Sequence, residues 1–567
     1  MPRRPNSPSR ARASASGRSR TGGGALVLAA LLGMAVPATA QIEVRPLATL
    51  DAFTTGAGGP GLGADLWQGA STPLVRQILP TLGTRPMSPA AMMLARHVLA
   101  TGATAPDGAG TDYDLAAQRA LALLALGDVR GVDAIVRAAP SLADSAPLAQ
   151  AAAESALILR QDDRACAIAK GLSVGRDGVY WLKLRAYCQA MAGDADAAQT
   201  TLSLANDAAK DPVFRRLMAA KLQGAGAPGA PSLRDGLDLA LTRALGIDPA
   251  PALDSASPAV AAEIARDPNL SPDTRLAAAA RAVRGALTLD DIFDQGAPPG
   301  PPTAEPPPPG GPDPRAVDTS VPSSSVIHDL AARPGVAAEA GLVSLALRQS
   351  DPALAFQAIE TLLGRAKTPA DFVTLSRLAR PAIRALAKPD TPLSAPFILA
   401  RAAVAAGDVD TAKALRARIK VEAPGGGASD LAILDAAIAA EGGAADAQTL
   451  DRLAERGLHD GPKSSTQPAA VLFLALGDPL SPDARAEVAG FDIAKGTAAP
   501  ARLALMDAAA TAHAKGEAAI MALSLAADAG TAGPVAADRA RMAEALRRAG
   551  LAADARAYAA EGLLSLK

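Results

Sequence analysis

Apolar and polar residues along this chain follow the spacing of helices. Segments of helix length rich in alanine and leucine succeed one another, whereas alternating Val, Ile, Thr and aromatic segments bounded by tight turns are almost absent. In the clearest segment, one helical stripe holds Trp181, Leu184, Cys188 and Met191. The pattern predicts an all-α fold.

One small unit recurs, in which a helix ends at a Gly-Asp-like turn and a second alanine-rich helix begins. The turns lie at Gly127, Gln161 and Gly193, and then at Gly407, Gly442, Gly477, Gly516 and Gly550. Glycine tolerates the left-handed conformation that ends a helix, and the aspartate that often follows can cap the next one. A period of 32–39 residues is typical of stacked helical hairpins.

Residues 181–212 resemble a degenerate tetratricopeptide repeat. Trp181, Leu184 and Ala197 fall where that family has its first-helix aromatic, its leucine and its second-helix alanine. Three positions depart from the family pattern: Arg185, Cys188 and Pro212. The resemblance implies tetratricopeptide-like antiparallel helical hairpins stacked into an α-solenoid. Other repeats match only through their turns, and a short bundle is equally expected at 225–285 and 326–400.

A proline-rich segment divides the chain. Residues 296–325 contain 11 prolines, which block helix formation, so we expect a disordered, extended linker or a ligand for a proline-recognising partner. The expected domains are a signal peptide (1–40), an N-terminal arm with the first helices (41–110), an N-terminal helical-repeat array (111–295), this linker (296–325) and a C-terminal helical-repeat array (326–567).

The first 40 residues have the pattern of a secretory signal peptide. Six arginines and no acidic residue precede the apolar run Ala25–Val36, and the small residues Ala38–Ala40 follow it. We expect cleavage near Ala40 and a periplasmic or secreted protein; the alternative is an uncleaved anchor.

Composition and charge exclude several classes of partner. About a quarter of the residues are alanine and 2% are aromatic, so the core depends on many close helix contacts. Without the first 40 residues the chain carries a net charge of about −7, which does not favour nucleic acid or anionic lipid. No later run is long and apolar enough to span a membrane.

The two cysteines of the chain, Cys166 and Cys188, are expected to form a structural disulfide. An even, small number of cysteines in an exported protein favours a bridge. Asp162 or Asp163 can cap a helix that runs to about Lys170, and a second helix is expected from about Val179 to Met191. A turn at residues 173–178 separates the two helices. Antiparallel helices folded about this turn bring the two cysteines to the same height. Neither a redox pair nor a metal site fits their spacing.

Other candidate sites are weak. The sequence "GLSVG" around Ser173 matches the G-x-S-x-G motif but lacks the strand that this motif requires. The glycine spacing near Lys463 does not fit a phosphate loop. The acidic pairs Asp162-Asp163 and Asp290-Asp291 fit helix capping. The scattered histidines are His97, His328, His459 and His513. We expect no catalytic, metal-binding or cofactor-binding residue.

Trp67 is one of two tryptophans and lies in a glycine-rich entry segment. Its large apolar area favours burial, so we expect it to pin the N-terminal arm onto the first hairpins. The alternative is an anchor for a partner.

These features predict a non-enzymatic, exported helical-repeat scaffold that binds a protein or peptide partner in the cell envelope, without a cofactor. The alternatives are an envelope enzyme, such as a peptidoglycan-cleaving hydrolase with an α-superhelical domain, and a structural envelope protein with no single partner.

Overall fold

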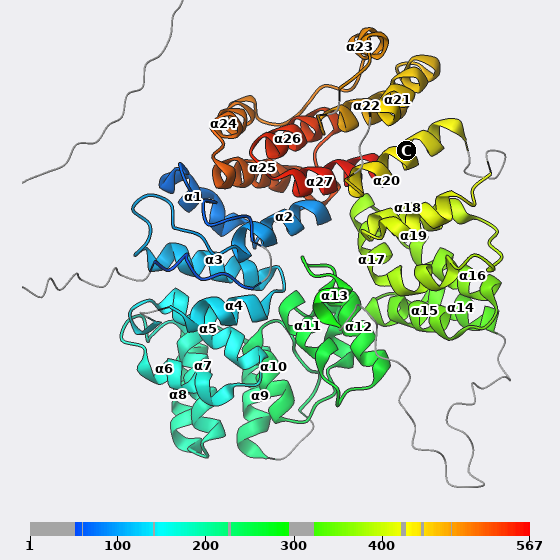
Figure 1. The fold of residues 1–567 in the computed structure, drawn as a ribbon. Coiled ribbons are helices and arrows are strands. Elements are labelled where there is room, and N and C mark those ends of the chain that lie inside the picture. Colours follow the sequence, from blue (N-terminus) through cyan, green and yellow to red (C-terminus); the bar gives the residue numbers. More distant parts are fainter. Residues whose placement is uncertain are drawn as a thin grey trace, which may run out of the picture. The chain divides into compact units, whose positions relative to one another are not determined.

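The computed structural model describes residues 51–58, 61–139, 142–224, 228–293, 323–420, 427–443, 447–477 and 479–566. Within these ranges every regular element is a helix and no strand occurs. Consecutive helices pack against their neighbours along the chain, which Figure 1 shows for pairs such as α7 and α8. The prediction of an all-α fold of packed helical hairpins, as in an α-solenoid, is confirmed.

The predicted signal peptide (1–40) lies outside the described residues, as does 296–322 of the predicted linker. The last three linker residues are already helical, because α14 begins at Ser323 rather than near Val326.

The helices before this gap are short. They are α1 (Thr72–Ile78), η1 (Leu79–Thr81), α2 (Pro89–Ala100), α3 (Tyr113–Ala125), α4 (Val129–Arg137), η2 (Leu142–Asp144), α5 (Ala146–Ile158), α6 (Asp162–Gly171), α7 (Val179–Met191), α8 (Ala195–Ala208), α9 (Pro212–Gln223), α10 (Gly236–Ala244), η3 (Ala250–Ser255), α11 (Pro258–Arg266), α12 (Pro272–Ala282) and α13 (Leu289–Ile292).

The helices after the gap have similar lengths. They are α14 (Ser323–Ala332), α15 (Val336–Arg348), α16 (Pro352–Leu363), α17 (Pro369–Leu386), α18 (Pro396–Ala405), α19 (Val409–Arg416), α20 (Ala428–Glu441), α21 (Ala447–Asp460), α22 (Thr466–Leu474), α23 (Pro482–Ala489), α24 (Pro500–Thr511), α25 (Lys515–Ala529), η5 (Gly530–Ala532), α26 (Ala536–Arg548) and α27 (Ala552–Ser565).

The Gly-Asp turns have the predicted chemistry. Gly193 and Gly407 adopt φ values of 83° and 72°, in the left-handed region that side chains disfavour. The aspartates that follow, Asp194 and Asp408, each accept a hydrogen bond from a backbone N–H in the first turn of α8 and α19. Each turn therefore ends one helix and starts the next within three residues.

Three of the predicted turns are built differently, and at Gly442 the left-handed residue is the next one, Gly443, with a φ of 67°. At Gln161 the left-handed residue is Arg160, and the N-cap makes no side-chain hydrogen bond, so Asp162 lies in the first turn of α6 and does not cap it. Gly516 lies inside α25 and is not a turn residue; a Cβ there would lie 2.6 Å from the ring of Trp67. At that position glycine is needed for close packing.

The segments on either side of the undescribed residues 294–322 pack against each other. Helix α12 contacts α15, and Nη2 of Arg284 lies 2.7 Å from Oε1 and Oε2 of Glu339. One apolar cluster contains residues from both segments, among them Val260 and Val343. The boundary between the two arrays stays a prediction.

The N-terminal segment packs against the C-terminal helices. Helix α2 contacts α25 and α27, which lie beside it in Figure 1. A second apolar cluster combines early residues such as Phe53 and Trp67 with Met506 and Leu523. Contacts between distant parts of the chain thus supplement those between neighbouring hairpins.

A buried arginine holds the N-terminal arm in place. Arg119 of α3 is fully buried, and its guanidinium donates to the carbonyl oxygens of Phe53, Thr55, Leu99 and Thr101. Burial lowers the pKa of Arg119 to about 10. Arg119 thereby joins two carbonyl groups of the irregular arm to two at the C-terminal end of α2.

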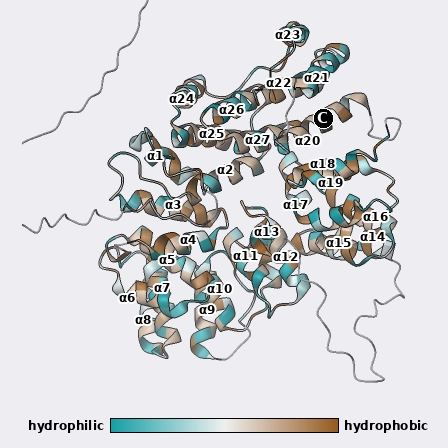
Figure 2. Cartoon of the chain, viewed as in Figure 1, coloured by the Kyte–Doolittle hydropathy of each residue, from teal (hydrophilic) through white to brown (hydrophobic). Residues whose placement is uncertain are grey.

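Most helices carry a mixture of apolar and polar residues, as Figure 2 shows. In the described part of the chain, no helix combines the length and low polarity needed to cross a bilayer.

Candidate functional site

A cavity of about 240 Å³ lies where helices distant in sequence meet. Its walls come from α2, α17, α18, α20 and α27, and we call it the α2–α27 cavity. Much of its lining is apolar, including Met93, Val373 and Ala557. Charged side chains also reach this lining, so their partners determine what the cavity can do.

Arg377 of α17 is the least compensated of these charges. Its Nη1 atom is buried and has no hydrogen-bond partner. Burial lowers the pKa of Arg377, although the negative charges of Glu561, Glu441 and Asp291 oppose this shift. Pro381 lies one turn later and has no N–H, so the carbonyl of Arg377 also lacks its usual intrahelical donor. A buried guanidinium without a partner is costly, which marks this residue as a candidate ligand contact.

Glu441 lines the same cavity as the last residue of α20. Burial raises its pKa, and the positive charges of Arg377 and Arg556 oppose this shift without a direct hydrogen bond. A carboxylate at a helix C-terminus also faces the negative end of the helix dipole, which disfavours it by roughly 0.3–1 kcal/mol. Its charge is therefore partly balanced by Arg377 and Arg556, but neither arginine makes a direct hydrogen bond to it.

The other charged groups of the cavity are paired. Nδ1 of His97 on α2 lies 2.7 Å from Oδ1 of Asp554 on α27. Glu561 accepts hydrogen bonds from Nη1 of Arg539, at 2.8 Å, and from the backbone N–H of Ala90, at 2.6 Å. These pairs join α2 to α27. Arg377 and Glu441 are the charged residues of the cavity for which no such close pair is found among the described residues.

A histidine held by a carboxylate is also a component of catalytic triads. Thr288 lines the α2–α27 cavity, but its hydroxyl donates to Asp291 at 2.8 Å and takes part in the capping box of α13. The hydroxyl is thus engaged in a helix cap. We assign no catalytic role to His97 or Asp554.

A larger cleft of about 700 Å³ adjoins the cavity, and Met93, His97 and Thr288 line both. We call it the arm cleft, because glycines and threonines of the N-terminal arm form one side of it. Its remaining lining includes Arg96, which bridges Asp128 and Asp291 at 2.9 Å each. The arm side presents backbone groups and small side chains.

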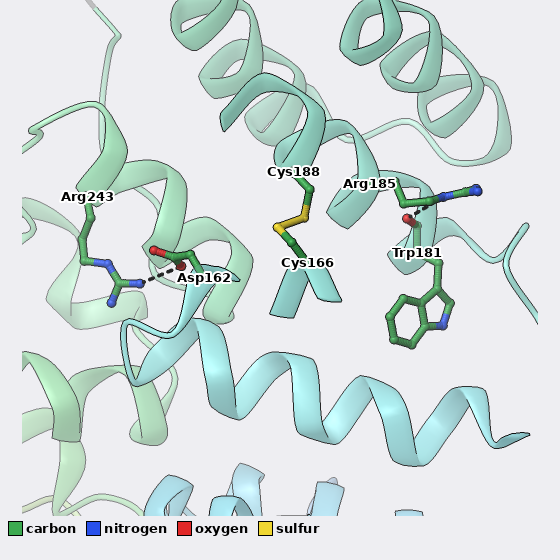
Figure 3. The surroundings of a disulfide bond; sticks show 6 residues. All are labelled: Asp162, Cys166, Trp181, Arg185, Cys188 and Arg243. Carbon is green, nitrogen blue, oxygen red and sulfur yellow. Dashed lines mark hydrogen bonds and ion pairs between the residues drawn. A yellow bond between two sulfur atoms is a disulfide. The ribbon is translucent and has the colours of Figure 1, made fainter. Parts of the chain in front are cut away.

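The structure contains the predicted disulfide between Cys166 and Cys188. It joins α6 to α7 with a Cα–Cα distance of 5.6 Å, and both helices have the predicted positions (Figure 3). The first turn of α6 is also held by Asp162, whose Oδ1 lies 3.5 Å from Nη2 of Arg243 on α10. The N-terminal half of α6 is therefore held both by the disulfide and by this ion pair.

The predicted stripe of α7 is only partly correct. Trp181 and Leu184 are buried and Cys188 is half-buried, but Met191, the last residue of the helix, is 44% exposed. In α8 the fully buried alanine is Ala198 rather than Ala197, so the register differs by one residue from the tetratricopeptide pattern.

The remaining candidate residues have local roles. Ser173 donates to the carbonyl oxygen of Ala143 at 2.7 Å in the α6–α7 loop, as expected of a turn residue. Asp291 caps α13, and Asp290 pairs with Arg380. Three histidines and the lysine are exposed: His328, His459, His513 and Lys463. In the described ranges, no group of three or more His, Cys, Asp or Glu residues is placed to hold a metal ion.

Trp67 is 1% exposed and does not offer a surface to a partner. Its ring packs edge-to-face against Phe53, with centroids 6.3 Å apart, and lies over Gly516 of α25. The interpretation as a partner anchor is therefore wrong. The arm is pinned, but to a C-terminal helix, a contact that the sequence could not locate because 449 residues separate the two positions.

The comparisons with known proteins returned no match to a family model, to a curated protein or to a solved structure.

Sequence reasoning missed Arg377, Glu441 and the pairing of His97 with Asp554. No catalytic or ligand-binding motif surrounds any of these residues. Pro381 inside α17 was a detectable signal, because an interior proline often marks a functional irregularity in a helix.

Proposed function

We propose that the chain is a non-enzymatic, exported helical-repeat scaffold that binds a protein or peptide partner in the cell envelope. The main observation in support is the arm cleft. Its volume of about 700 Å³ is large enough to bind a short segment of polypeptide. Its arm side offers the backbone of Gly56, Gly58 and Gly61, and backbone groups can bind an extended peptide with little dependence on sequence.

The disulfide supports the compartment in this proposal. Disulfides persist in oxidising environments such as the periplasm or the cell exterior, and are rare where thiols are kept reduced. The N-terminal pattern at residues 1–40 agrees with export. We also propose that the hairpins are tetratricopeptide-like, but binding of a partner in the arm cleft does not depend on this.

The test is chemical cross-linking in the native envelope, followed by isolation of the chain and identification of what it holds. Binding in the arm cleft predicts a discrete adduct that an Ala100→Phe variant loses, because Ala100 lines the cleft. An adduct unaffected by this substitution would place the partner elsewhere, and lack of any adduct would contradict the scaffold role.

A further inference from the structure

The α2–α27 cavity contains two opposite charges that the fold leaves without direct partners. Nη1 of Arg377 is buried and makes no hydrogen bond, and Glu441 interacts with Arg377 and Arg556 only at longer range. Charged groups removed from water without a partner are unfavourable. A ligand that supplies both an anionic and a cationic group would compensate both side chains at once.

The size and polarity of the cavity limit the rest of that ligand. A volume of about 240 Å³ corresponds to roughly eight water molecules, and is below the range of about 300–1,000 Å³ typical of drug-sized ligands. The lining also includes apolar side chains, such as those of Val373, Val404 and Ala557. The ligand therefore has a compact apolar body, with a volume comparable to that of about eight water molecules.

The paired groups of the cavity narrow the ligand further. Asp554 is held by His97 and Glu561 by Arg539, so neither is free for a second cation. An anion without a cationic group would leave Glu441 uncompensated beside it, and an amine without an acid would leave Arg377 uncompensated. A single molecule that carries both charges would therefore compensate both side chains.

We propose that the α2–α27 cavity binds a free apolar α-amino acid, with its carboxylate on Arg377 and its ammonium group on Glu441. The site is distinct from the partner binding proposed for the arm cleft, and either can be disproved without the other. Because α2, α17, α20 and α27 all line the cavity, the bound amino acid bridges both ends of the described chain.

The test is isothermal titration calorimetry on the purified chain with three probes of one shape. Leucine carries both charges, 4-methylpentanoate lacks the ammonium group and 3-methylbutylamine lacks the carboxylate. We expect leucine to bind at least tenfold more tightly than either analogue, since a hydrogen bond to a charged group changes affinity by roughly 10- to 100-fold. Equal binding of leucine and 4-methylpentanoate would overturn the proposal, as would no binding of glycine, alanine, leucine, methionine or phenylalanine.

Variants locate the site. Arg377→Met and Glu441→Gln should each weaken leucine binding at least tenfold, and Arg380→Gln on the same helix should leave it unchanged, because Arg380 pairs with Asp290 outside the cavity. Should the Arg377 variant fail to fold, Ala557→Leu fills the cavity and keeps both charges. Leucine binding that survives Ala557→Leu and Glu441→Gln would overturn the assignment.

Discussion

At the scale of single residues, the most perturbed carboxyl group with a defined pKa is Glu154 of α5. Its Oε2 accepts a hydrogen bond of 2.6 Å from the N–H of Gly236 at the start of α10. Its other oxygen, Oε1, is buried and interacts with the buried hydroxyl of Tyr180. Burial, and then the negative charge of Asp235, raises the pKa of Glu154 to about 8. The native protein therefore holds a proton here at neutral pH.

This proton makes stability depend on pH. An unfolded glutamate has a pKa of about 4.3, so the free energy of unfolding should fall as the pH rises from about 4.3 to 8, because over this range the unfolded state releases the proton while the native state keeps it. Glu154→Gln removes this dependence and should be more stable than the unsubstituted chain at pH 8.5, by up to about 4 kcal/mol. The measurement is urea unfolding at pH 5 and pH 8.5.

The matched control for this prediction is Glu455→Gln, which changes an exposed glutamate of α21. The control should follow the unsubstituted chain at both pH values. A Glu154→Gln variant whose stability advantage does not grow with pH would show that the carboxyl group is ionised in the native protein.

At the scale of elements, the helical hairpin is the part of the structure that local sequence determines best. The turn at Gly193-Asp194 and the limits of α7 were predictable, because glycine conformation and aspartate capping act within a few residues. The buried position at Ala198 and the exposure of Met191 were not, because they depend on how the hairpin meets its neighbours.

The disulfide should stabilise this element measurably. Linking Cys166 to Cys188 closes a loop with a sequence separation of 22 residues, which the chain-entropy estimate converts to about 3 kcal/mol. A Cys166→Ser/Cys188→Ser variant should unfold at a lower urea concentration, with its free energy of unfolding reduced by about 3 kcal/mol. Reduction of the disulfide in the unsubstituted chain should have the same effect. The variant itself should not respond to reductant; equal stability of all forms would contradict a structural role.

At the scale of the whole molecule, the contacts that build the candidate site join residues hundreds of positions apart. Glu561 of α27 binds the N–H of Ala90 at the start of α2, and Arg96 of α2 binds Asp291 of α13. No local pattern in the sequence encodes such pairs. The fold class could therefore be predicted from the sequence, whereas the α2–α27 cavity and the arm cleft could not.

The pair Arg539–Glu561 tests these long-range contacts. Arg539 is 1% exposed, so Glu561→Ala would leave a buried charge uncompensated and should lower the free energy of unfolding by about 3–5 kcal/mol. Because Ala90 also loses its acceptor, hydrogen exchange in α2 should rise together with that in α26 and α27. Glu544→Ala, at an exposed position of α26, is the control. Faster exchange confined to α26 and α27 would contradict coupling to α2.

The proposal of partner binding is tested most directly by site-specific photo-cross-linking in the native envelope. A photoreactive residue replaces Thr54, an exposed residue of the arm cleft, or Ser203, an exposed residue of α8 outside it. We predict one discrete adduct from position 54, none from position 203, and loss of the adduct when Ala100→Phe narrows the cleft. Equal labelling from both positions, or no adduct at position 54, would contradict a scaffold that binds its partner in this cleft.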